Sequence, residues 1–113
     1  MLIIAYSIFR PTGSVTQVID NIDTSKTYRI VFYYVKFDTP TANACTLTTT
    51  IGTQTILTEV NAAPRTPNNT FDQKITASFQ PTDSSMPLTI GVICTSVTLN
   101  RSCIDDVSIE EVI

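Results

Sequence analysis

Histidine is absent from this 113-residue chain, and its absence limits the chemistry that the protein can support. Histidine is the side chain that most readily changes charge near neutral pH, and it is the commonest general base and metal ligand. Ser–His and Cys–His nucleophilic catalysis are therefore excluded. Tryptophan, a frequent platform for stacking ligands, is absent as well.

Charged residues are also few, at 15% of the chain, and serine and threonine occupy polar positions in their place. Threonine suits the outward face of a strand and is poor in a helix, so the composition favours an all-β fold. The formal net charge of −3 argues against nucleic acid and anionic membranes as partners. No apolar run reaches the length of a membrane span. Residues 1–9 lack the basic start and the cleavage site of a signal peptide, so we interpret them as a strand.

No helical period is present; short alternating segments are separated instead by turns rich in proline, glycine, asparagine and aspartate. The expected strands are residues 2–9, 14–22, 27–37, 44–51, 54–60, 71–79, 88–94 and 103–113. About eight strands at this spacing predict an all-β, antiparallel β-sandwich. The length predicts a single domain, residues 1–113.

The segment 27–37 is the longest run of β-branched and aromatic residues, and we expect it in the middle of a sheet. Alternation places Tyr28, Ile30, Phe32 and Tyr34 on one face, which carries no charge and is expected to be core. The other face carries Arg29, Val31, Tyr33 and Val35, a mixture that fits a half-covered or ligand-facing surface.

The candidate ligand-binding residues are Arg29, Tyr33 and Tyr34, with Phe37 at the strand end. A flat aromatic side chain offers a stacking surface to the ring of a ligand, and arginine, glutamine and asparagine offer hydrogen bonds to its polar groups. The alternative is that Tyr33 packs beneath a loop and Arg29 only solvates an edge, because aromatic residues in strands are usually core. Gln73 lies on a face otherwise assigned inward.

The three cysteines allow two interpretations. All three are buried thiols of a cytosolic domain, or Cys45 and Cys94 form a disulfide in an oxidising compartment. Their positions in two predicted strands lead us to expect the disulfide, with Cys103 left without an assigned role. Asn68 and Asn100 begin N-glycosylation sequons in predicted loops, which favours secretion.

Several motifs resemble those of fungal secreted domains of the CenC-type carbohydrate-binding module class. They are SVTQVIDNIDTSKTYRIVFYY, a cysteine opening the strand at Cys45-Thr46-Leu47, a second cysteine ending a late strand at Cys94, and the terminal IDDVSI. The resemblance implies a galactose-binding-like jelly roll that recognises carbohydrate. The family's initial strand and its tryptophan-containing stretch are missing here, so we expect a member shortened at its N-terminus.

The acidic residues do not form a catalytic pair. Asp105 and Asp106 are adjacent on a strand, as are Glu110 and Glu111, so each pair points to opposite faces. Asp105 is expected to share the inward face of Val107, where it needs a partner. One interpretation is hydrogen bonding to backbone N–H groups. The other, which the resemblance implies, is a structural Ca²⁺ shared with an N-terminal loop, incomplete in this chain.

The sequence therefore predicts a secreted or cell-surface carbohydrate-binding module that is not an enzyme, needs no cofactor apart from that Ca²⁺, and binds a polysaccharide or glycan. The alternative is a structural or adhesive cell-wall domain with the same fold and no functional sugar site. Residues 2–9 carry no charge. We expect them either to pair in a homodimer through this N-terminal edge or to form a central, covered strand.

Overall fold

The structure, a computed structural model, describes residues 2–9, 13–37, 45–60, 71–94 and 101–113. In these ranges the chain forms strands β1 (Leu2–Phe9), β2 (Gly13–Ile19), β3 (Tyr28–Phe37), β4 (Cys45–Ile51), β5 (Gln54–Glu59), β6 (Asp72–Ile75), β7 (Met86–Cys94) and β8 (Arg101–Glu111). Across the described residues there is no helix long and apolar enough to cross a membrane.

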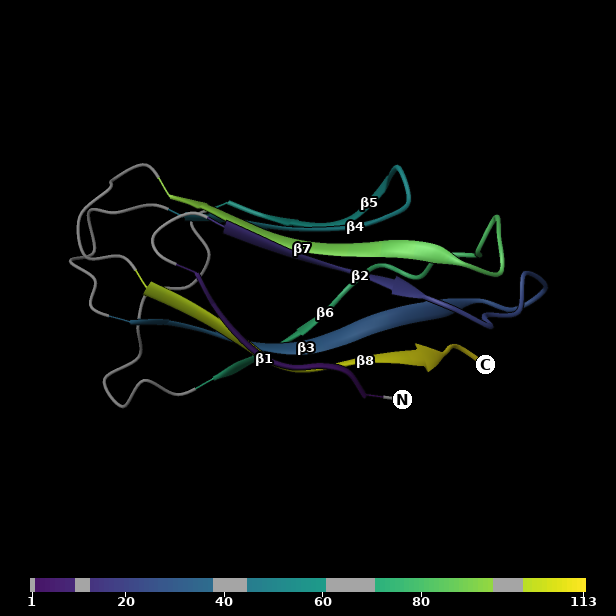
Figure 1. Ribbon diagram of the computed structural model, residues 1–113, viewed down its shortest axis with the longest axis horizontal. Helices are drawn as coiled ribbons and strands as arrows, with labels where there is room; N and C mark the ends of the chain where they lie inside the picture. Colours follow the sequence, from purple (N-terminus) through teal and green to yellow (C-terminus); the bar gives the residue numbers. More distant parts are fainter. Residues whose placement is uncertain (1, 10–12, 38–44, 61–70, 95–100) are drawn as a thin grey trace.

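The strands form two four-stranded antiparallel sheets that pack face to face (Figure 1). Sheet A has the order β1-β8-β3-β6, and sheet B has the order β2-β7-β4-β5. Apart from the β4–β5 hairpin, consecutive strands belong to opposite sheets, which is the connectivity of a jelly roll. The prediction of an all-β antiparallel sandwich is confirmed.

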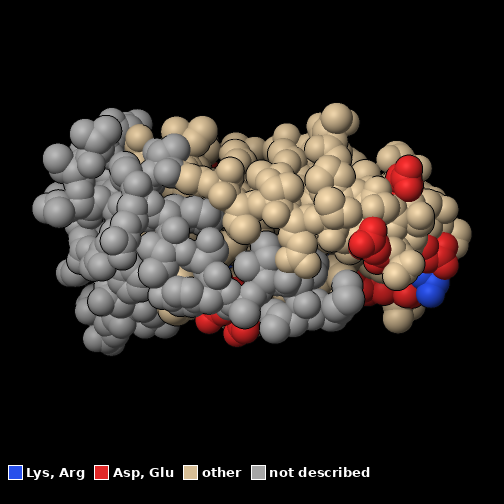
Figure 2. All heavy atoms as spheres, viewed as in Figure 1, with Lys and Arg blue, Asp and Glu red and all other residues tan. Residues whose placement is uncertain are grey.

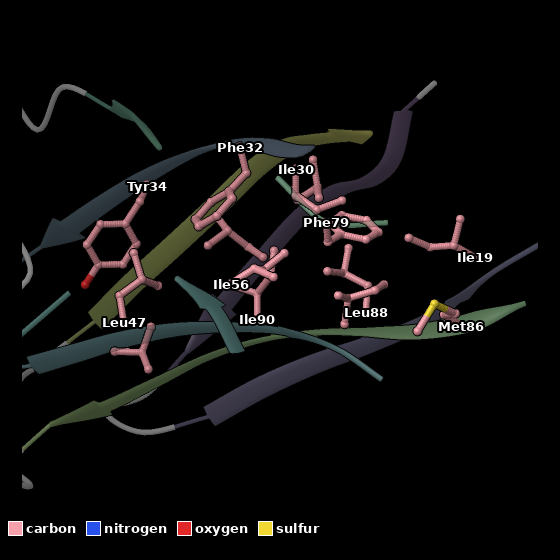
Figure 3. Packing of buried hydrophobic residues seen from close by; sticks show 14 of the residues in the cluster. Ile19, Ile30, Phe32, Tyr34, Leu47, Ile56, Phe79, Met86, Leu88 and Ile90 are labelled. Atoms are coloured by element: carbon pink, nitrogen blue, oxygen red, sulfur yellow. The ribbon is translucent and has the colours of Figure 1, made fainter. Parts of the chain in front are cut away.

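Strand β3 lies between β8 and β6, so the expectation that this segment occupies the interior of a sheet is also confirmed. Its alternation divides the side chains as predicted. Ile30, Phe32 and Tyr34 are each no more than 1% exposed and point toward sheet B (Figure 3). Burial of each such side chain stabilises the fold by roughly 1.5–3 kcal/mol.

Sheet B supplies the other half of the core through its two central strands. The apolar inward residues are Leu47 and Ile51 of β4 and Leu88, Ile90 and Val92 of β7, all fully buried. With the buried Thr49 between Leu47 and Ile51, inward residues recur at every second position, because only one face of an antiparallel sheet meets the core. Figure 3 shows Leu47, Leu88 and Ile90 beneath the β3 side chains.

A disulfide joins the two central strands of sheet B. Cys45 and Cys94 are directly opposite in the register of β4 and β7, and their sulfurs are bonded. The predicted pairing is therefore confirmed. With a sequence separation of 49 residues, the chain-entropy model gives a stabilisation of roughly 4 kcal/mol.

The strand expected over residues 71–79 is shorter, since β6 ends at Ile75. Beyond it the chain steps between the sheets: the Ala77 amide donates to the Ile56 carbonyl of sheet B, and Phe79 exchanges hydrogen bonds with Tyr28 of sheet A. These bonds satisfy the backbone where the two sheets separate. Residues 86 and 87, expected in a loop, begin β7.

Strand β8 contains a bulge that alternation alone does not predict. Val31 pairs with Ser108 and Tyr33 pairs with Asp105, so two steps along β3 correspond to three along β8. Asp106 has φ 50° within this step. The extra residue reverses which face the following side chains occupy.

Because of the bulge, Asp105 lies on a different face of sheet A from the one predicted. Ile104 and Val107 are both fully buried in the core although they are three positions apart. Asp105 therefore lies on the outer face of sheet A, opposite Tyr33, and the prediction that it shares an inward face with Val107 is wrong.

Strand β1 is at the edge of sheet A, where it pairs with β8 alone among the described strands. The expectation that residues 2–9 form a central strand is therefore wrong. Strand β8 lies between β1 and β3, which leaves β1 as the outermost strand of the sheet.

Candidate functional site

The outer face of sheet A carries a row of polar side chains centred on Tyr33. Asp105 of β8 and Gln73 of β6 lie directly opposite Tyr33 on either side. The Gln73 amide Nε2 donates to the Tyr33 hydroxyl at 3.2 Å. Tyr33 and Asp105 are half-buried and Gln73 is exposed. The register thus brings a phenol, an amide and a carboxylate from three strands into one line.

A second polar pair lies further along the same face. Arg29 of β3 is opposite Glu110 of β8, and Arg29 Nε lies 3.0 Å from Glu110 Oε2. Both side chains are about half exposed, at 44% and 45%. An ion pair this exposed is worth at most about 1 kcal/mol, so the guanidinium can exchange partners at little cost.

Apolar side chains separate the two polar groups. Val31 is buried, and its partner across the β3–β6 pair, Ile75, is 48% exposed. Ser108 lies on the other side of Val31. We call the surface made by Arg29, Tyr33, Gln73, Ile75, Asp105 and Glu110 the Tyr33 face.

The Tyr33 face combines the features that a sugar ring needs. The phenol ring and the Ile75 side chain offer apolar contact to ring C–H groups, and the flanking amide, carboxylate and guanidinium offer donors and acceptors. Arg29 and Tyr33 are four residues apart on β3, which corresponds to roughly 13 Å along the strand. The face is therefore long enough for more than one ring.

Tyr34, which was predicted to bind a ligand, is a core residue instead. Its ring is 1% exposed and belongs to the core, and its hydroxyl lies 3.1 Å from the buried Ser102 hydroxyl. Burial raises the pKa of the Tyr34 phenol above its ordinary value. It faces sheet B because it is one position along the strand from Tyr33, so it cannot contact a ligand on the Tyr33 face. The side chain of Phe37 lies outside the described part of the structure, so its predicted role stays a prediction.

Asp105 accepts a hydrogen bond at Oδ1 from the Asp106 backbone N–H at 2.8 Å. This contact agrees with the interpretation that backbone N–H groups satisfy the carboxylate. The described residues contain no group of three or more Cys, Asp or Glu that could hold a metal ion. The structural Ca²⁺ at Asp105 stays a prediction.

Three members of the Tyr33 face were not identified as site residues from the sequence. Gln73 and Ile75 were assigned inward with their alternating neighbours, and Glu110 was considered only as half of a carboxylate pair. All three reach the face through pairing register, and no local pattern in the sequence specifies which residues of distant strands lie opposite each other. Arg29 and Tyr33 lie on the outer face as the alternation of β3 predicted, and their role in binding a ligand stays a prediction.

The remaining predicted sites are elsewhere. Asn68 and Asn100 lie outside the described residues, so N-glycosylation stays a prediction. Cys103 is fully buried on the outward side of sheet A, opposite Val35 in the register.

Comparison with known proteins gives a structural neighbour but no sequence family. No family model matches the chain, and no curated protein matches it. Among solved structures, the C-terminal domain of EclA, described as a sugar-binding protein, superposes with a TM-score of 0.69 at 13% identity. The match covers 95% of this chain and 78% of that one. At this identity the likeness supports the β-sandwich fold, and the resemblance to CenC-type modules stays a prediction.

Proposed function

We propose that this protein is a non-catalytic carbohydrate-binding module and that the Tyr33 face binds the glycan. The observation that carries the proposal is the half-buried Tyr33 ring held between Gln73 and Asp105 on the outer face of sheet A. A ring fixed in this way loses little conformational freedom when a sugar stacks on it. The sugar-binding description of a domain with the same fold supports the same ligand class.

The disulfide supports a secreted or cell-surface location for this module. Disulfides form and persist in oxidising compartments and are rare in the cytosol. Cys45 and Cys94 are bonded across two central strands, so the bridge is part of the sandwich itself. Secretion, glycosylation at Asn68 and Asn100, and the fungal resemblance belong to this proposal.

A structural or adhesive cell-wall domain is the second candidate, and one observation favours it. The polar groups of the Tyr33 face already have partners within the protein: Tyr33 with Gln73, and Arg29 with Glu110. A ligand would have to replace these contacts. The exposure of the Arg29–Glu110 pair makes that replacement inexpensive, which is why we prefer the glycan site.

A glycan array probed with the parent protein and three Tyr33-face variants tests the proposal. Tyr33→Ala removes the stacking surface and should weaken binding at least tenfold, which is about 1.4 kcal/mol. Tyr33→Phe is the matched control, because it keeps the ring and loses only the hydroxyl bonded to Gln73. Ile75→Ala should weaken binding to a smaller extent.

Thermal unfolding of the same variants separates a binding role from a core role. Because Tyr33 is only half-buried, we expect Tyr33→Ala to destabilise the protein by less than about 2 kcal/mol. A much lower melting temperature would identify Tyr33 as a core residue. Unchanged binding by a folded Tyr33→Ala variant would exclude this face as the glycan site.

A further inference from the structure

The bulge in β8 places two consecutive carboxylates on the outer face of sheet A. Asp105 lies opposite Tyr33, and the next residue, Asp106, is exposed. Strand β8 has β1 on one side and β3 on the other, and its inner face meets the core. The exposed Asp106 side chain therefore lies on the outer face with Asp105. The prediction that these two side chains point to opposite faces is wrong, because it assumed a regular strand.

The charges that the structure describes on this face do not balance. They belong to Arg29 and Glu110, which form an ion pair, and to Asp105 and Asp106. The ion pairs among the described residues do not include Asp105 or Asp106. Figure 2 shows acidic atoms along the lower edge of the molecule, the side on which Figure 1 draws sheet A. Tyr33 therefore lies beside two carboxylates that have no described counter-charge.

Asp105 can accept further hydrogen bonds next to the Tyr33 ring. Its Oδ1 accepts the Asp106 backbone N–H, and no described group donates to Oδ2. The side chain is half-buried, so water and salt screen its charge less than they screen a fully exposed carboxylate. Neighbouring strands are roughly 4.8 Å apart, which places this carboxylate within reach of a substituent on a ring stacked on Tyr33.

We propose that the Tyr33 face selects a glycan with free amino groups, whose ammonium lies against Asp105 and Asp106 while a sugar ring stacks on Tyr33. This selectivity rests on the proposed function, because it concerns the same site. An ammonium group has three donors and no acceptor, which suits a carboxylate, and its hydrogen bonds to that carboxylate are charge-assisted. The face of the Tyr33 ring also attracts positive charge.

Other classes of glycan fit this charge distribution less well. A neutral ring on Tyr33 would take water from the half-buried Asp105 carboxylate without neutralising it, and such desolvation is unfavourable. A uronic acid would be repelled by both aspartates, since like charges brought together at an interface oppose binding. The ammonium of an amino sugar replaces the lost water with an opposite charge.

Isothermal titration calorimetry with two soluble hexamers tests the selectivity. One is a β-1,4-linked hexamer of glucosamine, and the other is the same hexamer with every amino group acetylated. They share the rings and the linkage, and in mildly acidic buffer only the first carries ammonium groups. We expect the parent protein to bind the glucosamine hexamer at least tenfold more tightly at low salt. That preference should shrink as salt is added, because ions screen charge–charge attraction.

Three variants assign the preference to particular charges. Asp105→Asn keeps the shape and the Oδ1 acceptor, so it should weaken binding of the glucosamine hexamer at least tenfold and change binding of the acetylated hexamer less than twofold. Asp106→Asn should weaken glucosamine binding several-fold, and asparagine tolerates the backbone conformation of this position. Asp83→Asn removes an equal charge from an exposed position outside sheet A and is the control; it should change neither affinity.

Tyr33→Ala, measured in parallel, distinguishes this proposal from the proposed function. Weaker binding of both hexamers by Tyr33→Ala, with equal affinities in the parent protein, keeps the glycan site and overturns only its selectivity. Glucosamine binding that does not depend on Tyr33, or that falls as much in Asp83→Asn as in Asp105→Asn, is non-specific attraction to an acidic protein and overturns the selectivity. Loss of glucosamine binding on addition of EDTA would assign the carboxylates to a metal ion and also overturn it. Absence of Tyr33-dependent binding to any glycan overturns both proposals.

Discussion

At the scale of single residues, Thr49 of β4 places a hydroxyl in the core without a hydrogen-bond partner among the described residues. It alternates with the outward Thr48 and Thr50, so its backbone position is favourable and only the hydroxyl is costly. A buried hydroxyl that makes no hydrogen bond costs about 1–3 kcal/mol.

We expect Thr49→Val to raise the free energy of unfolding by about 1 kcal/mol, because it replaces the orphan hydroxyl with a methyl group of similar size. Urea unfolding of the two proteins measures the difference. Thr48→Val is the control: this side chain faces outward, and its effect on stability should stay within about 0.5 kcal/mol. A Thr49→Val variant less stable than the parent would show that the hydroxyl has a partner.

Tyr34 gives the core a dependence on alkaline pH. Burial raises the pKa of its phenol above the ordinary value near 10, so the unfolded chain loses this proton at lower pH than the folded protein. Its contribution to stability is therefore complete below pH 10 and is lost as pH rises through the folded pKa.

Tyr34→Phe should remove that part of the alkaline destabilisation, although it also gives up the contact with the Ser102 hydroxyl. We expect the variant to be less stable than the parent at pH 7 and to lose less stability between neutral and alkaline pH. Melting temperatures across that range measure this, with Tyr33→Phe as the control for a half-buried phenol. Parallel pH curves for Tyr34→Phe and the parent would contradict the assignment.

At the scale of elements, the bulge of β8 sets the composition of the Tyr33 face. It turns Asp105 outward and keeps Val107 in the core, and it depends on Asp106 holding φ 50°. Aspartate tolerates this conformation better than most residues, and glycine adopts it without strain.

Asp106→Gly should therefore leave the protein as stable as the parent or more stable by up to about 1 kcal/mol, whereas Asp106→Val should cost more than about 1 kcal/mol. Chemical unfolding of the pair measures both effects. Equal stabilities for the glycine and valine variants would show that the bulge does not require the left-handed conformation.

This bulge also marks the limit of what the sequence could predict. Period-two alternation was enough to place Ile30, Phe32 and Tyr34 in the core and Tyr33 outside, because β3 is regular along that stretch. Alternation failed at Asp105, since one inserted residue reverses the faces and the sequence does not mark the insertion. Gln73 and Glu110 were missed for a related reason: their places depend on pairing between strands far apart in the chain.

At the scale of the whole molecule, two contacts join strands that are separated in the sequence. The disulfide joins β4 to β7 in the middle of sheet B, and Lys74 of β6 lies 2.8 Å from Glu59 of β5, which connects the two sheets along one side. The Lys74 side chain is only 12% exposed, so this ion pair is better shielded than the pair at Arg29. This ion pair therefore links sheet A to sheet B on the β5–β6 side of the sandwich.

The N-terminal edge of sheet A is different, and we expect the protein to dimerise through it. At eight residues β1 is twice as long as β6, the other edge strand of the sheet, which has four. Residues 2–9 contain neither a charge nor a proline, the two devices that most often protect an edge. Antiparallel pairing of β1 with its copy would satisfy the outer backbone groups and join two sheets A into one.

Size-exclusion chromatography with light scattering over a dilution series should show a concentration-dependent dimer. Tyr6→Lys, opposite Asp105 in the register, places a charge on this edge and should shift the equilibrium to monomer by at least tenfold. Gln73→Lys adds the same charge to the opposite edge strand and should leave the dimer unchanged. A parent protein that is monomeric at every concentration, with rapidly exchanging amides in residues 2–9, would show that this edge is neither paired nor covered.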